Sequence, residues 1–327
     1  MNPSTDRRQF LGQTAALIAA GAGLSAQSGL AEAADEVAIR GADAMIPIVD
    51  THQHLWDLKK FRLPWLHDAP LLARSFLMED YLEATKGLGV VKSVYMEVDV
   101  EPAQQVEEAE YAIDLCRRKA GPMVGAVISG RPNSEGFKEY LSRFEKSPEI
   151  KGVRQVLHGP ITPPGYCLDE QFIRGIRLLG ERGLSFDICI RPEELGDAAK
   201  LIDACPGTSF ILDHCGNANV RSKDLTAWQA GLSQVAERKN VVAKVSGIVA
   251  SAAPGPWTPD DLAPIVNRVL DTFGPDRVVF GGDWPVCTLA ASYGAWVEAL
   301  RTIVRERSEA VRRKLFHDNA VRVYRLA

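Results

Sequence analysis

Eight short apolar runs alternate along this 327-residue chain with longer segments of helical period, and this alternation constrains the fold more than any other feature. Several of the runs are apolar at successive positions, as expected of strands that are covered on both faces. The predicted strands lie at 46–51, 92–98, 123–129, 152–157, 184–190, 209–213, 241–245 and 277–281. The alternation predicts βα units and a parallel sheet.

The segments of helical period lie at 102–119, 134–146, 169–182, 193–204, 225–239 and 260–273, with two more at 292–306 and 308–324. Eight such units in roughly 280 residues are typical of a single (β/α)8 TIM barrel, a fold of the α/β class. A doubly wound sheet often has a glycine-rich phosphate loop after its first strand, but this first run leads into Asp50-Thr51-His52-Gln53-His54. The barrel is therefore the predicted fold, with the aromatic segment 55–76 as a loop over its catalytic face.

The N-terminus has the pattern of an export signal. Arg7 and Arg8 precede an Ala/Gly-rich apolar run at 14–26, and Ala31-Glu32-Ala33 offers a small-x-small cleavage site. We expect 1–34 to be a twin-arginine signal peptide, read by the twin-arginine export machinery, and 35–327 to be a periplasmic barrel domain. The alternative is an amphipathic first helix. The apolar run is too short for a transmembrane span, so we expect no stable membrane association.

The net charge indicates the kind of partner to expect, and the spacing of the cysteines indicates their role. The formal net charge of −4 gives no basic footprint for nucleic acid, so a small-molecule substrate is expected and a nucleic-acid partner is not. The six cysteines are scattered without a C-x-x-C pair, and Cys189 lies inside an apolar run where a thiol acts as a small hydrophobe. Structural thiols are expected, with metal ligation by Cys215 or Cys287 as the alternative.

Polar residues gather at the predicted strand ends, where a barrel of this kind carries its functional side chains. They are His52, His54, Glu97, Arg154, His214, Lys244, Ser246 and Asp283. The i, i+2 spacing of His52 and His54 points both side chains to one side of a strand. Taken alone, each residue has a structural explanation, such as Asp283 serving the turn before Pro285. Three of the chain's six histidines fall at strand ends together with an aspartate, and this convergence favours a functional site.

Such a set of side chains suits hydrolysis. Imidazoles and a carboxylate are ligands for one divalent ion, zinc being the best suited, which would polarise a carbonyl and acidify bound water. Asp283 would take the proton of the attacking water and deliver it to the leaving oxygen. His52, His54, His214 and Asp283 are thus the predicted catalytic residues, and they are also the predicted ligands of a mononuclear metal.

Five blocks of sequence resemble the amidohydrolase superfamily, specifically its amidohydrolase-related lactonase branch. They are Val49-Asp50-Thr51-His52-Gln53-His54-Leu55-Trp56, Gly152-Val153-Arg154, Leu212-Asp213-His214-Cys215-Gly216, Lys244-Val245-Ser246-Gly247 and Gly281-Gly282-Asp283-Trp284-Pro285. The branch includes lactonases for rhamnonolactone, fuconolactone, sulfomuconolactone and pyrone-dicarboxylate. The resemblance implies opening of a sugar-acid or carboxylated lactone and assigns Arg154 to the substrate. We also expect Glu97, Trp56 and Trp284 to contact the substrate.

The chain departs from the superfamily's binuclear members, which have a bridging lysine on strand four and a histidine on strand five. Here strand four carries Arg154, and strand five reads Phe186-Asp187-Ile188-Cys189-Ile190. We therefore expect at most one ion, and catalysis without metal stays open. Two alternative functions also stay open: a metal-dependent non-oxidative decarboxylase of the same superfamily, and a periplasmic binding protein that has lost catalysis.

Overall fold

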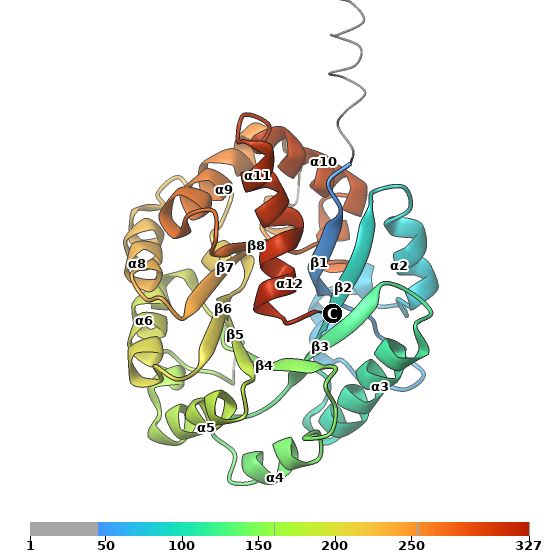
Figure 1. The fold of residues 1–327 in the computed structure, drawn as a ribbon, viewed down its shortest axis with the longest axis vertical. Helices are drawn as coiled ribbons and strands as arrows, with labels where there is room; N and C mark the ends of the chain where they lie inside the picture. The colour runs from blue at the N-terminus through green and yellow to red at the C-terminus, as the bar shows by residue number, and fades with distance from the viewer. Residues whose placement is uncertain (1–44, 160, 254, 327) are drawn as a thin grey trace, which may run out of the picture. The chain divides into compact units, whose positions relative to one another are not determined.

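The computed structural model describes residues 45–159, 161–253 and 255–326, and within them eight parallel strands follow one another around a barrel (Figure 1). The strands are β1 Ile48–Gln53, β2 Val90–Met96, β3 Met123–Ser129, β4 Ile150–Val156, β5 Ser185–Cys189, β6 Ser209–Leu212, β7 Val241–Val245 and β8 Val278–Phe280. A parallel bridge between Gln53 and Trp284 links the segment after β8 back to β1. The predicted (β/α)8 barrel is confirmed.

Helices surround the strands (Figure 1). They are α2 Met78–Ala84, α3 Gln105–Arg118, α4 Phe137–Ser142, α5 Glu170–Glu181, α6 Leu195–Ala204, α7 His214–Asn217, α8 Thr226–Ala236, α9 Pro259–Phe273, α10 Tyr293–Ile303, α11 Glu309–Arg313 and α12 Asn319–Val323. The predicted helix at 308–324 is divided by a π-helical turn, η8 Lys314–Asp318, and α4 is shorter than predicted. The sequence did not indicate α2, because seven residues are too few to display a helical period.

The segment 55–76 crosses between β1 and α2 as predicted, without a regular helix. It contains two short 3-10 turns, η1 Pro64–Asp68 and η2 Pro70–Leu72, each begun by a proline. Other 3-10 turns introduce or follow longer elements: η3 Pro102–Gln104, η4 Tyr166–Leu168, η5 Pro192–Glu194, η6 Ala250–Ala252 and η7 Val286–Leu289. Leu66, Leu72 and Phe76 are buried, so this loop is packed onto the barrel.

The last helix closes one end of the barrel. In Figure 1, α12 lies across the middle of the ring of strands. Ala320, Tyr324 and Leu326 pack with apolar side chains from the barrel interior, among them Val49 and Val279. Lys151 Nζ donates to the Arg325 carbonyl at 3.4 Å from the start of β4, which places this plug at the N-terminal ends of the strands. The opposite end is left for the functional site.

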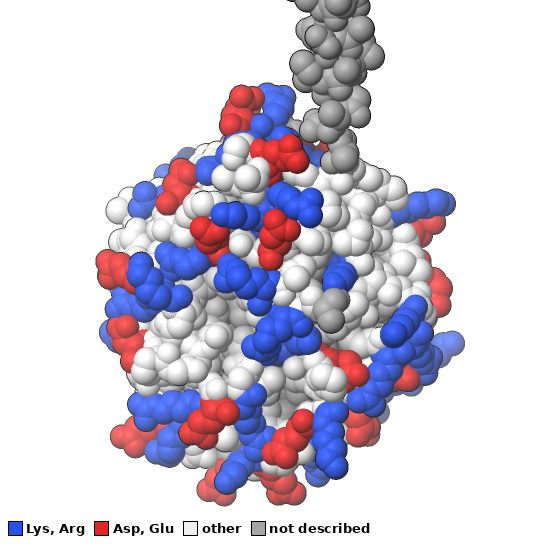
Figure 2. All heavy atoms as spheres, viewed as in Figure 1, with Lys and Arg blue, Asp and Glu red and all other residues white. Residues whose placement is uncertain are grey.

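The surface around α12 carries both signs of charge. Figure 2 shows Lys and Arg side chains interspersed with Asp and Glu on this face, in keeping with the small net charge. Among the residues that the structure describes, no helix combines the length and apolar character needed to cross a membrane. The predicted signal peptide and the domain boundary at residue 34 lie outside the described residues.

Candidate active site

Asp50 joins the beginning of the barrel to its end. Its buried carboxylate accepts hydrogen bonds from the Gly282 and His52 N–H groups at 2.7 and 3.0 Å. It also accepts from the hydroxyls of Tyr81 and Tyr293 at 2.9 and 3.1 Å. A Cβ on Gly282 would lie 2.2 Å from the Tyr293 ring, so only glycine fits. Asp50 therefore ties the sequence motif of β1 to the motif that follows β8.

The contact between these two motifs places His52 and His54 beside the Asp283 carboxylate. The Asp283 N–H donates to the His52 carbonyl at 2.7 Å. Oδ1 of Asp283 then lies 3.6 Å from His52 Nε2 and 3.4 Å from His54 Nε2. The other ring nitrogen of His54 lies 3.0 Å from the Met96 carbonyl, which orients that ring. His52 is the last but one residue of β1 and His54 follows the strand.

The third histidine is presented by a left-handed turn after β6. The residues of α7 have positive φ angles, including 52° at His214 itself. His214 Nδ1 lies 3.0 Å from Ser246 Oγ, and the ring lies 4.4 Å from that of His52. A Cβ on Gly247 would lie 2.2 Å from His214 Nδ1, so the Ser246-Gly247 pair both orients the imidazole and leaves room for it. Burial disfavours the charged form of His214, but Asp283 and its other neighbours outweigh this and raise its pKa.

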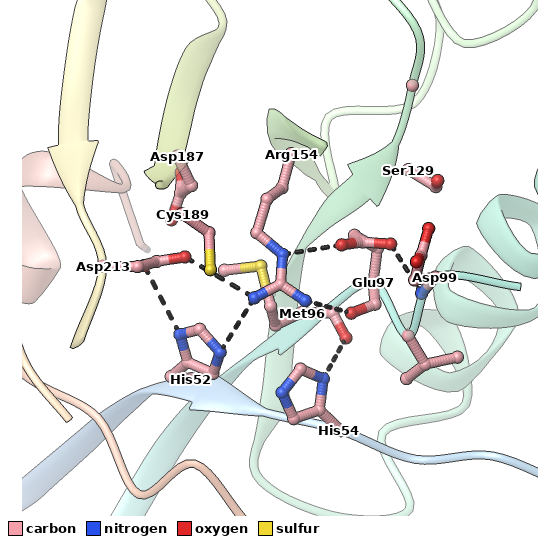
Figure 3. Close-up of polar contacts among 12 residues, drawn as sticks. His52, His54, Met96, Glu97, Asp99, Ser129, Arg154, Asp187, Cys189 and Asp213 are labelled. Carbon is pink, nitrogen blue, oxygen red and sulfur yellow. Dashed lines mark hydrogen bonds and ion pairs between the residues drawn. The ribbon is translucent and has the colours of Figure 1, made fainter. Parts of the chain in front are cut away.

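Arg154 and Glu97 form a buried ion pair beside His52 (Figure 3). Arg154 Nε donates to Glu97 Oε1 at 2.6 Å, and Nη2 donates to the Glu97 carbonyl at 2.8 Å. The remaining nitrogen, Nη1, lies 3.2 Å from His52 Nε2. The two hydrogen bonds to Glu97 therefore hold the Arg154 guanidinium in the orientation that brings Nη1 to the His52 imidazole.

A second buried cation lies on the other side of His52. Lys244 Nζ lies 2.8 Å from Asp187 Oδ2, 2.8 Å from Asp213 Oδ1 and 3.3 Å from His52 Nδ1. The Tyr324 hydroxyl of the C-terminal plug donates to Asp187 at 3.1 Å. Burial raises the pKa of Asp187 to about 6, whereas Lys244 and His52 overcome burial and hold the pKa of Asp213 well below its usual value. Both carboxylates are thus ionised at neutral pH.

Burial lowers the pKa of His52 well below its usual range, despite the nearby Asp213 carboxylate. The imidazole is therefore neutral at pH 7, with one nitrogen that donates and one that accepts. Each ring nitrogen faces a cation that can only donate, since Nε2 lies 3.2 Å from Arg154 Nη1 and Nδ1 lies 3.3 Å from Lys244 Nζ. Nδ1 also lies 3.5 Å from Asp213 Oδ1.

A cavity of about 570 Å³ opens over these groups. Its lining residues are His54, Trp65, Val98, Asp99, Arg154, Val156, His158, Gly159, Cys189, His214, Asn217, Gly247, Ala250, Ser251, Asp283 and Val286. His54, His214, Asp283 and Arg154 thus meet at one cavity, whereas His52 is fully buried and is not among the lining residues.

The other three predicted substrate contacts lie elsewhere. Trp56 is fully buried, packs edge-on against Trp65 and Phe76, and donates from Nε1 to the Arg74 carbonyl at 2.6 Å. Trp284 is buried against Phe76 and Tyr81. Neither indole lines the cavity, and Glu97 is fully buried behind Arg154. Trp56 and Trp284 pack against other aromatic side chains, and Glu97 pairs with Arg154. These three residues therefore support the site from behind and do not line its cavity.

Some residues at the site were missed in the sequence. Asp187 and Asp213 complete the buried charge network, while Cys189, His158 and Trp65 line the cavity. One signal was available: Asp187 is a lone charge in the apolar run of β5, which is costly to bury without a partner. Cys189 is free and buried, as predicted, and its strand ends at the cavity.

The donor groups fit a single divalent ion. His52, His214 and Asp283 each offer a ligand atom, and these atoms lie within 4.8 Å of one another. His54 contacts Asp283 but is not part of this group, so three of the four predicted ligands come together. Two imidazoles and one carboxylate are a donor set typical of catalytic zinc sites that keep a position for water. From β4, Arg154 and Val156 line the cavity.

Comparison with known proteins identifies the class. A family model described as Amidohydrolase matches residues 49–326, and the chain belongs to this family. An L-fucono-1,5-lactonase of Burkholderia multivorans is 27% identical over 293 residues, which cover 85% of this chain and 96% of that protein. An L-rhamnono-gamma-lactonase of Scheffersomyces stipitis is 22% identical, covering 85% of this chain and 98% of that protein.

A solved structure agrees with these relatives. The crystal structure of an amidohydrolase from Burkholderia multivorans with bound zinc superposes with a TM-score of 0.78 at 25% identity, covering 86% of this chain and all of that chain. The fold, the family and the lactonase relatives together define this chain as an enzyme, a hydrolase of the lactonase branch of the superfamily, as its motifs predicted.

Proposed function

We propose that this hydrolase opens an uncharged lactone by attack of water, with Asp283 as the general base. The observation that carries the proposal is the position of Asp283. Its carboxylate lies at the cavity, 3.4 Å from His54 Nε2 and 3.6 Å from His52 Nε2, where a water and a carbonyl oxygen can be bound together.

In the proposed reaction, Asp283 takes a proton from water as the water oxygen attacks the carbonyl carbon. The ring C–O bond then breaks, and Asp283 returns the proton to the leaving alkoxide, so that one hydroxyl and one carboxylic acid are formed. His54 and His214 would orient the carbonyl oxygen from the cavity wall. A divalent ion held by His52, His214 and Asp283 would polarise that carbonyl when bound.

The charge of the cavity favours a neutral substrate. Among the described lining residues, Arg154 is the one Lys or Arg, and its guanidinium is already paired with Glu97 at 2.6 Å. Asp99 adds a carboxylate to the same wall, and this carboxylate is paired with Arg131 at 3.0 Å. A substrate carboxylate would have to compete with Glu97 for Arg154, whereas hydroxyl groups can bind His158 and Asn217. We therefore infer a neutral sugar lactone in preference to a carboxylated one.

A substrate panel tests this function. Release of acid from neutral five- and six-membered sugar lactones is measured beside a pyrone dicarboxylate and a dihydroxybenzoate, with carbon dioxide recorded in parallel. We expect acid release from the neutral lactones without carbon dioxide. Carbon dioxide from the benzoate would instead identify a decarboxylase, and preferred hydrolysis of the dicarboxylate would contradict the charge argument.

A further inference from the structure

Cys189 ends β5 with its thiol at the cavity wall. The Asn217 side chain donates to its Sγ at 3.7 Å. All six cysteines are free and buried, but Cys189 alone among them lines this cavity. Its position differs from that of a structural thiol, since it lies among polar groups of the site.

Three different donor types meet at this point. Sγ of Cys189, a carboxylate oxygen of Asp213 and a ring nitrogen of His214 lie within 4.8 Å of one another. They come from the ends of the neighbouring strands β5 and β6, and Figure 3 shows Cys189 and Asp213 close together on one side of His52. Because Ser246 Oγ lies 3.0 Å from His214 Nδ1, the other ring nitrogen of His214 is left for a ligand.

Asp213 is the third carboxylate of the buried cluster. Glu97 pairs with Arg154 at 2.6 Å and Asp187 pairs with Lys244 at 2.8 Å, so these three carboxylates face only two cations. Lys244 Nζ lies 2.8 Å from Asp213 Oδ1 and Arg154 Nη1 lies 3.6 Å from its Oδ2, yet neither oxygen of this fully buried carboxylate accepts a hydrogen bond of good geometry from the described residues. The Asp213 oxygens therefore keep lone pairs that a bound cation could use.

His52 is the weaker alternative as a ligand. Its Nε2 lone pair already faces Arg154 Nη1 at 3.2 Å, so an ion bound there must displace a guanidinium that Glu97 holds in place. The group of Cys189, Asp213 and His214 does not use His52. His214 belongs to both groups, so only one of the two can be occupied at a time.

We propose that Cys189, Asp213 and His214 form a thiolate-containing site for one soft divalent ion, zinc or cadmium. Thiolate and imidazole select such ions over magnesium and calcium, and a three-ligand site keeps a position open towards the cavity. The thiol releases its proton to solvent when the ion binds. The proposal does not depend on the identity of the substrate.

Cobalt titration of the metal-free protein tests the site, because a thiolate ligand gives cobalt(II) an intense near-ultraviolet charge-transfer absorption that nitrogen and oxygen ligands do not. We expect one cobalt per chain with this absorption in the wild type. Cys189→Ser should abolish the absorption and lower zinc affinity at least tenfold, measured by competition with a chromophoric chelator. Cys116→Ser, a buried thiol on α3, is the matched control and should retain both.

Cobalt bound without the charge-transfer absorption, or no binding at all, would overturn the proposal. So would an absorption that persists in Cys189→Ser. An Asp213→Asn variant checks the carboxylate separately, and its zinc affinity should also fall while the thiolate absorption remains at saturating cobalt. Equal zinc affinity of Asp213→Asn and the wild type would remove Asp213 from the site.

Discussion

Nη1 of Arg154 lies 3.2 Å from Nε2 of His52, so a permanent cation faces one ring nitrogen of the central imidazole. Two consequences follow. A guanidinium only donates, so this contact is a hydrogen bond only when His52 is neutral and has its lone pair at Nε2. The position of the Arg154 guanidinium also depends on its hydrogen bond to Glu97. Glu97 therefore influences His52 through Arg154, although it does not line the cavity.

Removing Arg154 alone should therefore be costly. Arg154→Met leaves Glu97 fully buried with an uncompensated charge and should lower the free energy of unfolding by about 3–5 kcal/mol. The double variant Glu97→Gln/Arg154→Met should recover much of this loss. Urea unfolding of both single variants and the double variant measures the coupling, and strictly additive losses would show that the two side chains do not depend on each other.

Asp283→Asn tests the proposed base. Asparagine has the same shape and tolerates the positive φ of 53° at this position, so the fold should be retained. It cannot accept a proton, and turnover should fall by roughly 10²–10⁴. The turnover number and the melting temperature of this one variant are the measurements. A residue that only serves the turn before Pro285 would give the reverse, with near-normal turnover and a lower melting temperature.

Glu108 should make stability depend on pH. Burial raises its pKa from the ordinary value of 4.5 to about 8, so the folded state binds a proton that the unfolded state has lost in this window. The free energy of unfolding should therefore fall as pH rises between these two values, by up to about 1.4 kcal/mol per pH unit. Urea unfolding at several pH values measures this.

Glu108→Gln should remove that dependence and be more stable than the wild type above pH 8. Gln keeps an acceptor for the Tyr95 hydroxyl and the Val98 N–H, which Glu108 binds at 3.0 and 2.7 Å. The exposed neighbour Glu107→Gln is the control and should follow the wild type. Parallel pH curves for Glu108→Gln and the wild type would contradict the assignment.

Substitutions of Trp65 and Trp56 should have different effects, the first on substrate binding and the second on the stability of the fold. Trp65 lines the cavity, so Trp65→Ala should raise KM roughly tenfold or more through lost apolar contact with the substrate. Trp56 is fully buried behind the site, so Trp56→Ala should instead lower stability by about 3–5 kcal/mol. Steady-state kinetics and thermal unfolding of both variants distinguish the roles. If Trp56→Phe changed KM more than Trp65→Phe did, Trp56 and not Trp65 would be the substrate contact.

The export signal is a proposal that rests on the sequence alone. Replacing Arg7 and Arg8 together by Lys should leave the precursor in the cytoplasm, because the twin-arginine machinery reads the arginine pair. Cell fractionation with detection of precursor and mature protein measures this. Arg40→Lys, beyond the predicted cleavage site, is the control. Unchanged export of the Arg7/Arg8 variant would refute the signal.

The sequence by itself determined the barrel and most of its catalytic face. Runs such as 123–129 and 241–245 were predicted with the observed bounds, because strands covered by helices are apolar throughout. Parallel strands all end at one face, so His52, His214 and Asp283 could be placed together without knowing any contact. The loop aromatics could not be placed in this way, since nothing in the sequence says whether Trp56 faces the core or the substrate.

Only the tertiary structure decided how the charges around His52 are shared. Glu97, Arg154, Asp187, Asp213 and Lys244 come from five different strands or strand ends, and their pairing depends on which side chains point into the barrel at the same height. The place of Cys189 beside His214 has the same origin, because neighbouring strands bring together residues that lie far apart in sequence. Local sequence pattern fixes the period of a strand, whereas long-range packing fixes the partners of a buried charge.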